Sequence, residues 1–366
     1  MIRRILVIGM SGDKGGIENY LLNLYENLDK SKIQFDFLVK DEIGESYTKR
    51  IRKQGGNIYI IGTFRKNIVG VMNRLIKLYK SRQYSRIYVN LSYAPTMIYV
   101  LPALFYRGVK VYVHSHASDD FRKKRHLIFR KLFFELFPNK RNYVYIGCSE
   151  SACLWMFGDK CVKKHKMHVI KNGVCFEKFI YSESKKKAVR AKLELNDNFV
   201  VGHVGRFSEE KNHHFILDAF RELLRLKPEA RLLLIGEGHL MDDIKSLSEQ
   251  YGLNNKVIFL GGVSDTSDYY NAMDCFWLPS LYEGFPIVAV EAQINGLKCI
   301  FSEQIDREVD IVEENVFASI SNVSEFVAIT SNIEESYQRD LEGKQDKLKK
   351  FDLEESVNQV QALLLK

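Results

Sequence analysis

The chain has 366 residues, of which 46% are hydrophobic and 27% charged, as in an ordinary globular protein. This length predicts two domains rather than one core. The first ten residues read as a strand and not as a secretory signal, and the most apolar later stretch, residues 95–106, is too short to span a bilayer. We therefore expect a cytoplasmic protein that does not cross the membrane and keeps its six cysteines reduced.

Charge is distributed unevenly along the chain, although the net charge is only +8. Residues 1–180 contain 33 Lys and Arg against 14 Asp and Glu, and residues 51–100 contain no acid at all. The remainder carries an excess of acids. This asymmetry predicts an anionic partner for the first half, either a membrane surface or nucleic acid.

The first half alternates strand-like and helical patterns. A strand is expected at 5–9 and a helix at 17–28, and four more apolar runs read as strands, at 34–39, 57–62, 86–91 and 109–116. Such alternation predicts an open, mostly parallel sheet with helices on both faces.

The same pattern restarts near residue 199. Strands are expected at 199–205, 231–236, 257–262, 275–280 and 298–302, with helices at 213–226, 241–252, 265–273 and 286–296 between them. Two such series predict two Rossmann-like, doubly wound α/β domains that face each other across a cleft. The carboxyl ends of the strands are where such sheets bind ligands.

Residues 283–291 read EGFPIVAVE and carry a carboxylate at each end of an apolar stretch. Glu283 follows a predicted strand, Pro286 starts a helix, and Glu291 lies further along that helix. A helix N-terminus offers backbone N–H groups to a phosphate or a sugar edge. The first carboxylate can accept hydrogen bonds from sugar hydroxyls and the second from a ribose. The spacing suits a molecule with a sugar at one end and a nucleoside at the other.

Residues 205–215, GRFSEEKNHHF, follow the first strand of the second series. Arg206 and Lys211 lie in a loop that opens toward the same site, where two cations can neutralise a diphosphate. Alone, they would read as solvated surface charges. No DxD sequence is present, so the chain offers no obvious site for a metal-bridged diphosphate.

Two loops of the first half are further candidates. MSGDKGGIENY, residues 10–20, contains Gly15 and Gly16 just before a helix and can approach a phosphate, although it matches neither GxGxxG nor a Walker A sequence; a tight turn is the alternative. VYVHSHASDD, residues 111–120, places His114 and His116 at a strand end, where they can be functional or structural.

Together these residues resemble the retaining glycosyltransferases of family 4, which have the two-domain GT-B fold. The resemblance covers nearly the whole chain and is most similar to the bacterial capsule and exopolysaccharide branch. It implies a domain at 1–171, rejoined by a helix at about 350–366, and a donor domain at 172–349. It is carried by GGIE (15–18), HSHAS (114–118), CSESACLWMFG (148–158), NGV (172–174), GHVGRFSEEKNHHF (202–215), IGEG (235–238), LPSLYEGFP (278–286) and VEAQINGL (290–297).

The resemblance implies roles for the matched residues. Glu283 faces the transferred sugar and Glu291 holds the donor ribose, while Arg206 and Lys211 stabilise the leaving nucleoside diphosphate. One of the two histidines, with His116 slightly favoured over His114, lies near the reacting carbon. The remaining donor-binding residues are Gly15, Gly16, Glu237, Val263, Gly284, Phe285 and Pro286.

Two positions depart from the family pattern. Cys175 replaces an Asp that often follows the NG[IV] turn, and Val263 replaces an Arg; both concern contacts to the nucleotide. The resemblance implies a UDP-sugar donor, retention of anomeric configuration and no metal or other cofactor.

The basic segment at 120–141 reads as an amphipathic helix on an anionic inner-membrane surface, because eight bases surround apolar residues at near-helical spacing. The alternative is a domain helix with one buried face. We expect a lipid-linked saccharide acceptor, peripheral membrane association and no nucleic acid. Three alternative hypotheses for the function are a GT-B nucleotide-sugar epimerase, a dinucleotide-binding oxidoreductase, and a non-catalytic membrane-surface or nucleic-acid binding module.

Overall fold

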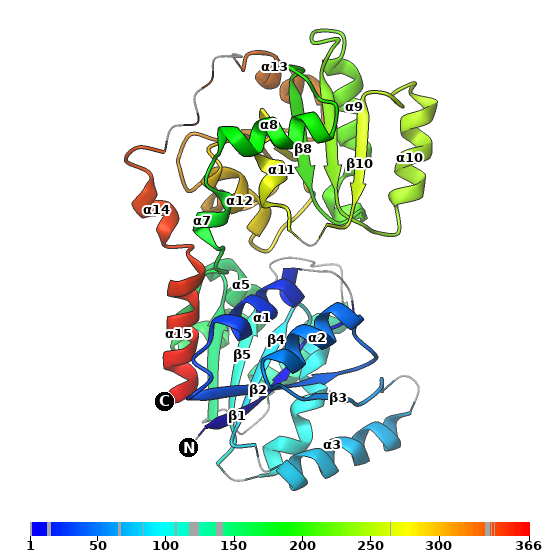
Figure 1. Ribbon diagram of the computed structural model, residues 1–366. Helices are drawn as coiled ribbons and strands as arrows, with labels where there is room; N and C mark the ends of the chain where they lie inside the picture. Colours follow the sequence, from blue (N-terminus) through cyan, green and yellow to red (C-terminus); the bar gives the residue numbers. More distant parts are fainter. Residues whose placement is uncertain are drawn as a thin grey trace. The chain divides into compact units, whose positions relative to one another are not determined.

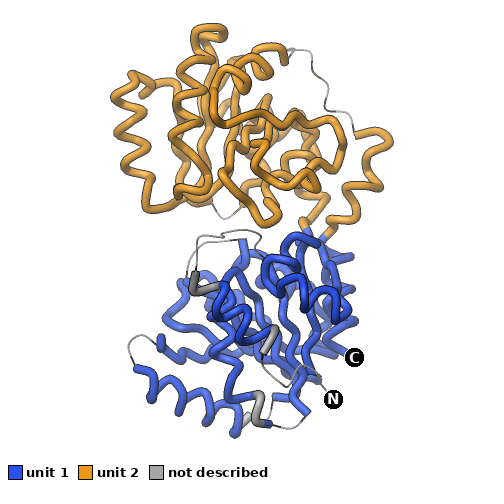
Figure 2. The backbone as a smooth tube through the Cα atoms, turned by 180° about the vertical axis from the view of Figure 1, so that it is seen from behind, with its two compact units in different colours: residues 1–173, 353–366 blue, residues 174–352 orange. Residues whose placement is uncertain are grey.

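The computed structural model divides the chain into two compact units, coloured separately in Figure 2. Unit 1 comprises residues 1–173 and 353–366, and unit 2 comprises residues 174–352. The structure describes residues 2–12, 16–64, 67–82, 84–106, 108–116, 124–136, 142–263, 265–333, 337, 339 and 341–366.

The described residues of unit 1 form a seven-stranded parallel sheet in the order β3-β2-β1-β4-β5-β6-β7. Its central strands are almost continuously apolar and buried, as expected for a parallel sheet covered on both faces. The strands are β1 (Arg3–Ile8), β2 (Ile33–Val39), β3 (Ile58–Ile60), β4 (Arg86–Leu91), β5 (Lys110–Ser115), β6 (Tyr143–Gly147) and β7 (Met167–Val169).

Helices pack around this sheet, and several of them contact one another, such as α1 with α15 and α5 with α6 (Figure 1). The C-terminal helix α15 packs on α1, and the side chain of Gln361 accepts a hydrogen bond from the backbone N–H of Asp29 at 2.8 Å. The helices are α1 (Gly16–Asn27), α2 (Glu45–Lys53), α3 (Ile68–Arg82), a 3-10 helix (Ala94–Phe105), α4 (Lys124–Arg130), a π-helix (Lys131–Leu136), α5 (Glu150–Phe157), α6 (Asp159–Lys164) and α15 (Leu353–Leu365).

Unit 2 contains a six-stranded parallel sheet in the order β10-β9-β8-β11-β12-β13. Its strands are β8 (Val200–Val204), β9 (Arg231–Ile235), β10 (Val257–Gly261), β11 (Cys275–Leu278), β12 (Lys298–Ser302) and β13 (Val316–Ala318). Its helices include α7 (Phe176–Phe179), α8 (Glu183–Lys192), α9 (His213–Leu223), α10 (Met241–Gln250), α11 (Ser267–Tyr270), α12 (Ile287–Ile294), α13 (Val323–Ser331) and α14 (Gln345–Lys349).

Both sheets reverse their strand order once, between β1 and β4 in unit 1 and between β8 and β11 in unit 2. The loops that leave neighbouring strands at such a point turn to opposite faces and leave a crevice at the carboxyl ends, where α/β sheets bind ligands. The predicted fold class, two Rossmann-like doubly wound units, is confirmed.

Several local predictions differ from the structure. The helix expected at 265–273 is a single turn, α11, and α12 begins at Ile287, one residue after Pro286. Strands β6, β7 and β13 were not predicted. In the basic segment, the described residues 124–136 form α4 followed by a π-helix, and Phe133 and Phe134 of that π-helix are buried in the core of unit 1.

Candidate functional site

Three loops at the carboxyl edge of the unit 2 sheet are joined through their backbones. Gly205 N–H bonds to the carbonyl of Ile235 at 2.9 Å, and Gly236 N–H bonds to the carbonyl of Gly261 at 2.9 Å. A Cβ on Gly236, whose φ is +146°, would lie 1.9 Å from the Gly205 oxygen. Glycine is therefore required where the loops after β8, β9 and β10 come together.

A fourth loop, after β11, is tied to the loop after β8. The backbone N–H of Leu281 donates to the carbonyl of Glu210 at 2.8 Å, and the side chain of Asn212 donates to the carbonyl of Pro279 at 3.2 Å. Since β8 and β11 flank the strand-order reversal, the two loops carrying Lys211 and Glu283 meet at the switch point.

Lys211 and Glu283 form an ion pair there. The Lys211 ammonium donates to Glu283 Oε1, and the hydroxyl of Ser280 donates to the same oxygen at 2.7 Å. The two side chains are only 15% and 11% exposed, so the pair is shielded from most of the solvent. A carboxylate held by two donors has a defined orientation, and the lysine places a positive charge beside it.

Three more predicted donor residues of unit 2 lie in the loops that follow β8, β9 and β10, on the same edge of the sheet as this pair. Arg206 and Glu237 are exposed, and Val263 is partly exposed. The backbone N–H of Phe207 bonds to the Glu237 carbonyl at 3.0 Å, which joins the Arg206 and Glu237 loops, and Gly262 lies against the Glu237 side chain.

The EGFP loop leads directly into α12. Gly284 is partly exposed, Phe285 is buried and stacks on Phe351 with ring centroids 5.3 Å apart, and Pro286 is buried at the N-cap of the helix. The stacked ring anchors the loop, so a contact from Phe285 to a ligand would involve its backbone.

Glu291 lies in the second turn of α12. The hydroxyl of Tyr270, which is fully buried, donates to Glu291 Oε2 at 2.6 Å. Desolvation raises the pKa of Glu291 to about 7, with a smaller contribution from the negative charge of Asp265, while the tyrosine hydrogen bond acts in the opposite direction. The Glu291 carboxyl group is therefore expected to gain or lose its proton close to neutral pH.

In unit 1, the two candidate histidines lie at the end of β5 with ring centroids 4.1 Å apart. His114 is fully buried, and its Nδ1 lies 2.6 Å from the hydroxyl of Tyr88. His116 Nε2 lies 2.8 Å from Asn90 Oδ1, and its Nδ1 lies 3.1 Å from Asn172 Oδ1. His116 is therefore clamped between two amides.

Burial lowers the pKa of His116 to about 3 and that of His114 well below its usual value, so both rings are neutral at physiological pH. A neutral imidazole has one donor and one acceptor, so one of the two amides must present its NH2 to His116. Within the described residues, Asn90 Nδ2 is buried with no hydrogen-bond partner. Turning the Asn90 amide satisfies both groups, with His116 Nδ1–H donating to Asn172.

The glycine loop of unit 1 is described in part. Gly15 lies outside the described residues, and Gly16 is exposed at the first position of α1. The buried Glu18 accepts hydrogen bonds at Oε1 from the backbone N–H and the hydroxyl of Ser11, at 3.0 and 2.6 Å. This contact fixes the first turn of α1 against the beginning of the loop, where the chain leaves β1.

Comparison with known proteins identifies the family. The family model described as "Glycosyltransferase Family 4" matches residues 14–178, and that described as "Glycosyl transferases group 1" matches residues 185–347. EpsF from Bacillus subtilis, named as a glycosyltransferase, is 31% identical over 320 residues, covering 84% of this chain and 81% of EpsF. The chain belongs to the family 4 glycosyltransferases.

Two further comparisons extend this identification. An Escherichia coli enzyme named as a UDP-Gal:alpha-D-GlcNAc-diphosphoundecaprenol alpha-1,3-galactosyltransferase is 28% identical over 78% of this glycosyltransferase and 76% of its own length. The crystal structure of Anabaena HepE in complex with UDP matches 100% of this chain and 99% of its own with a TM-score of 0.79, at 19% identity. The fold of the glycosyltransferase is therefore GT-B.

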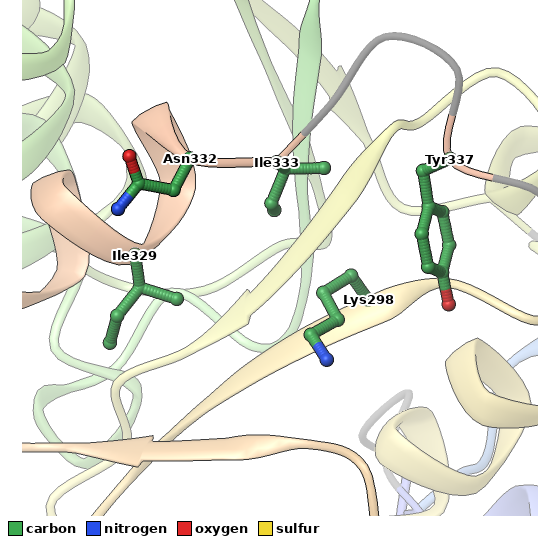
Figure 3. A pocket seen from close by; sticks show the side chains of 5 residues that line it. All are labelled: Lys298, Ile329, Asn332, Ile333 and Tyr337. Carbon is green, nitrogen blue, oxygen red and sulfur yellow. The ribbon is translucent and has the colours of Figure 1, made fainter.

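A cavity of about 410 Å³ lies elsewhere in unit 2 of the glycosyltransferase (Figure 3). Its lining includes Lys298, the first residue of β12, so it opens at the opposite edge of the sheet from the loops described above. None of the predicted site residues is among the described residues that line it. These described lining residues are Lys298, Ile329, Asn332, Ile333 and Tyr337.

The residues that hold the site residues in place were not predicted from the sequence. Ser280 lies inside the matched LPSLYEGFP motif, and a hydroxyl three residues before a glutamate is a usable signal. Tyr270 and Asn90 gave no such signal, and Asn172, although it opens the NGV motif, gave none for its contact with His116, because each reaches its partner only through the fold.

Proposed function

We propose that this enzyme is a retaining glycosyltransferase that moves a hexose or N-acetylhexosamine from a UDP-sugar to a lipid-linked saccharide in capsular or exopolysaccharide assembly. The observation that carries the proposal is the Lys211–Glu283 pair at the switch point of unit 2, in which Lys211 shares its loop with the exposed Arg206. A cation-lined loop next to an oriented carboxylate suits a substrate with a diphosphate bonded to a sugar.

Relatives support the UDP-sugar and the polysaccharide context. HepE was solved with UDP, and the E. coli relative is named for UDP-Gal. The capsular polysaccharide biosynthesis glycosyltransferase CapM of Staphylococcus aureus is 32% identical over 197 residues, which cover 52% of this chain and 50% of CapM.

The mechanism that we propose uses fixed charges. Departure of UDP builds negative charge on the phosphate oxygens, and Arg206 and Lys211 stabilise that charge without a metal ion. Glu283 orients the transferred sugar by accepting hydrogen bonds from its hydroxyls. The acceptor attacks from the face that UDP leaves, and the leaving phosphate takes the acceptor's proton, so that configuration is retained.

The histidines of unit 1 are assigned a positioning role near the reacting carbon. His116, neutral and held by two amides, is suited to orienting the sugar by contact rather than to exchanging protons. His114 supports His116 by packing its ring against the ring of His116.

The acceptor side involves the membrane in this proposal. The E. coli relative is named for a diphosphoundecaprenol-linked acceptor. In the basic segment 120–141, of which the structure describes 124–136, Leu127, Ile128 and Leu132 are exposed beside the core residues Phe133 and Phe134. Exposed apolar side chains amid basic residues favour peripheral docking on an anionic inner membrane. No described helix is long and apolar enough to cross a bilayer.

A thermal-shift and hydrolysis panel of UDP-, GDP-, ADP- and TDP-sugars, with and without EDTA, tests the proposal. We expect UDP compounds alone to stabilise the protein, equally in EDTA, and the variant Arg206→Ala to lose that stabilisation. Stabilisation only by another nucleotide would overturn the donor assignment, and dependence on added metal would overturn the metal-free mechanism. No response to any nucleotide would redirect attention to the basic segment as a binding module.

A further inference from the structure

Tyr270 is placed to control Glu291, the second glutamate of the EGFPIVAVE stretch. Its hydroxyl is 2.6 Å from Glu291 Oε2 and 3.4 Å from the carbonyl of Val288, one turn earlier on α12. The ring is fully buried and packs on Phe179 and Phe276, with centroid distances of 5.6 and 5.8 Å. Close packing of this kind restricts the rotamer of a side chain, so the position of the Tyr270 hydroxyl is well defined.

The backbone that carries Tyr270 is also held in place. Arg339 donates to the carbonyls of Tyr270 and Asn271, both at 3.3 Å, and to that of Met273, which satisfies the end of α11. The same guanidinium donates to Asn295 Oδ1, and Asn295 is the C-cap residue of α12.

The two asparagines complete the connection between the helices. Asn271 and Asn295 are both fully buried, and the amide of Asn295 donates to the carbonyl of Phe179 at 2.8 Å and lies 3.4 Å from Asn271 Oδ1. This network joins the ends of α11 and α12, the two helices that carry Tyr270 and Glu291. A buried, satisfied polar network of this kind rigidifies the elements that it connects.

We propose that Tyr270 is a positioning residue for donor binding: it occupies Oε2 of Glu291 and directs Oε1 toward the two hydroxyls of the donor's ribose. The inference rests on the proposed use of a nucleotide sugar by the same site. Without the tyrosine hydroxyl the Glu291 carboxylate can rotate. The ribose hydroxyls would then meet a carboxylate whose position is no longer fixed.

Few charged groups surround Glu291 among the described residues, so the effect of the Tyr270 hydrogen bond on the pKa of Glu291 can be measured from the pH dependence of activity. Asp265, in the loop before α11, raises the pKa of Glu291, and Lys178 of α7 lies 3.6 Å from Asp265. Cys299 of β12 interacts electrostatically with Tyr270. The tyrosine hydrogen bond is the contribution that favours the ionised carboxylate, so its removal raises the pKa of Glu291 further.

The variant Tyr270→Phe keeps the ring and removes only the hydroxyl. We expect its KM for the UDP-sugar to rise about tenfold, the lower end of the effect of a hydrogen bond to a charged group, with kcat nearly unchanged. The acidic limb of its kcat/KM profile should move to higher pH. Tyr269→Phe is the matched control, since Tyr269 is the partly exposed neighbour on the same turn and should leave both quantities unchanged.

Binding of UDP and of a UDP analogue lacking both ribose hydroxyls isolates the ribose contact from chemistry. Wild type should prefer UDP, and Tyr270→Phe should lose most of that preference. In a Glu291→Gln background, Tyr270→Phe should have no further effect. Retention of the preference and of the pH profile by a folded Tyr270→Phe protein would overturn the inference. A wild type that binds neither compound would instead overturn the proposed donor site.

Discussion

Lys211 and Glu283 are 72 residues apart in the sequence and form an ion pair between the loops that follow β8 and β11. The pair exists because β11 lies beside β8 in the sheet, although two strands separate them in the chain. Neither partner is positioned by its own loop alone. The hydroxyl of Ser280 and the contacts of Asn212 and Leu281 with the opposite loop complete the arrangement.

Glu283→Gln should reduce kcat/KM for transfer at least about a hundredfold, because removal of an oriented charged group from an active site has effects of this size. The unpaired Lys211 should cost roughly 1–3 kcal/mol of unfolding free energy. Urea denaturation and a transfer assay measure the two effects separately. Glu229→Gln, at an exposed residue of unit 2, is the control. Normal turnover by Glu283→Gln would contradict the assignment.

Arg206→Ala should leave stability within about 0.5 kcal/mol of wild type, since Arg206 is exposed. Its effect should fall on the diphosphate instead, and the thermal stabilisation by UDP should be lost while that by uridine, which has no phosphate, is unchanged. Arg225→Ala is matched to it, as an arginine 74% exposed on the unit 2 surface. An equal loss of UDP binding in both variants would indicate a general charge effect and not a site.

The fold could be predicted because parallel strands buried on both faces leave continuous apolar runs, and these runs are separated by helical patterns along the chain. Strands β7 and β13 have three residues each and are defined by their neighbours rather than by their own sequence. Helix α11 ends after one turn because Asn271 bonds back to the carbonyl of Ser267 and accepts from the N–H of Ser182, a partner 89 residues away. Such contacts have no local signature.

As with the fold, only part of the candidate site could be predicted from the sequence. Its charged residues, such as Arg206 and Glu283, belong to motifs that can be read from the sequence. The side chains that orient the site, such as Tyr270 on Glu291 and Asn172 on His116, come from other elements and required the structure. The protonation states required it as well, because burial determines them.

Glycine at position 9 should be indispensable. Its φ is +118°, and a Cβ there would lie 2.0 Å from the carbonyl oxygen of Asn90, so Gly9→Ala combines strain with a backbone clash. We expect a loss of more than about 2 kcal/mol in unfolding free energy. Gly252→Ala is the matched control, since Gly252 also has a positive φ of 70° but no atom within 4 Å of the added methyl. Equal losses in the two variants would show that the clash contributes nothing.

Stability should fall as the pH is lowered below about 6.5. Burial lowers the pKa of His116 to about 3 and that of His213 to about 2. Below about pH 6.5 these histidines are therefore protonated in the unfolded chain but still neutral in the native state. Each such histidine contributes stability that is complete above its unfolded pKa and is lost by roughly 1.4 kcal/mol per pH unit below it. Glu291 acts in the opposite direction, since its raised pKa of about 7 contributes stability that is lost as pH rises from about 4.5 to 7.

Urea denaturation between pH 5 and 7.5 measures this slope. His213→Phe keeps an aromatic ring stacked on Phe207 and removes one titrating group, so its slope should be shallower than that of wild type. His239→Phe, at an exposed position, should not change the slope. An unchanged slope in His213→Phe would mean that the buried ring is not neutral.

Membrane docking should depend on the exposed apolar residues of the basic segment. Ile128 is 64% exposed and Leu132 40% exposed, so changing both to Ser removes apolar surface without creating a cavity. We expect wild type to float with vesicles containing anionic lipid and not with neutral ones, more weakly at high salt, and the double variant to float several-fold less. Leu226→Ser, at a residue of unit 2 that is 60% exposed, is the control and should float like wild type. Equal flotation of the double variant and wild type would show that the exposed apolar side chains of this segment do not contribute to docking.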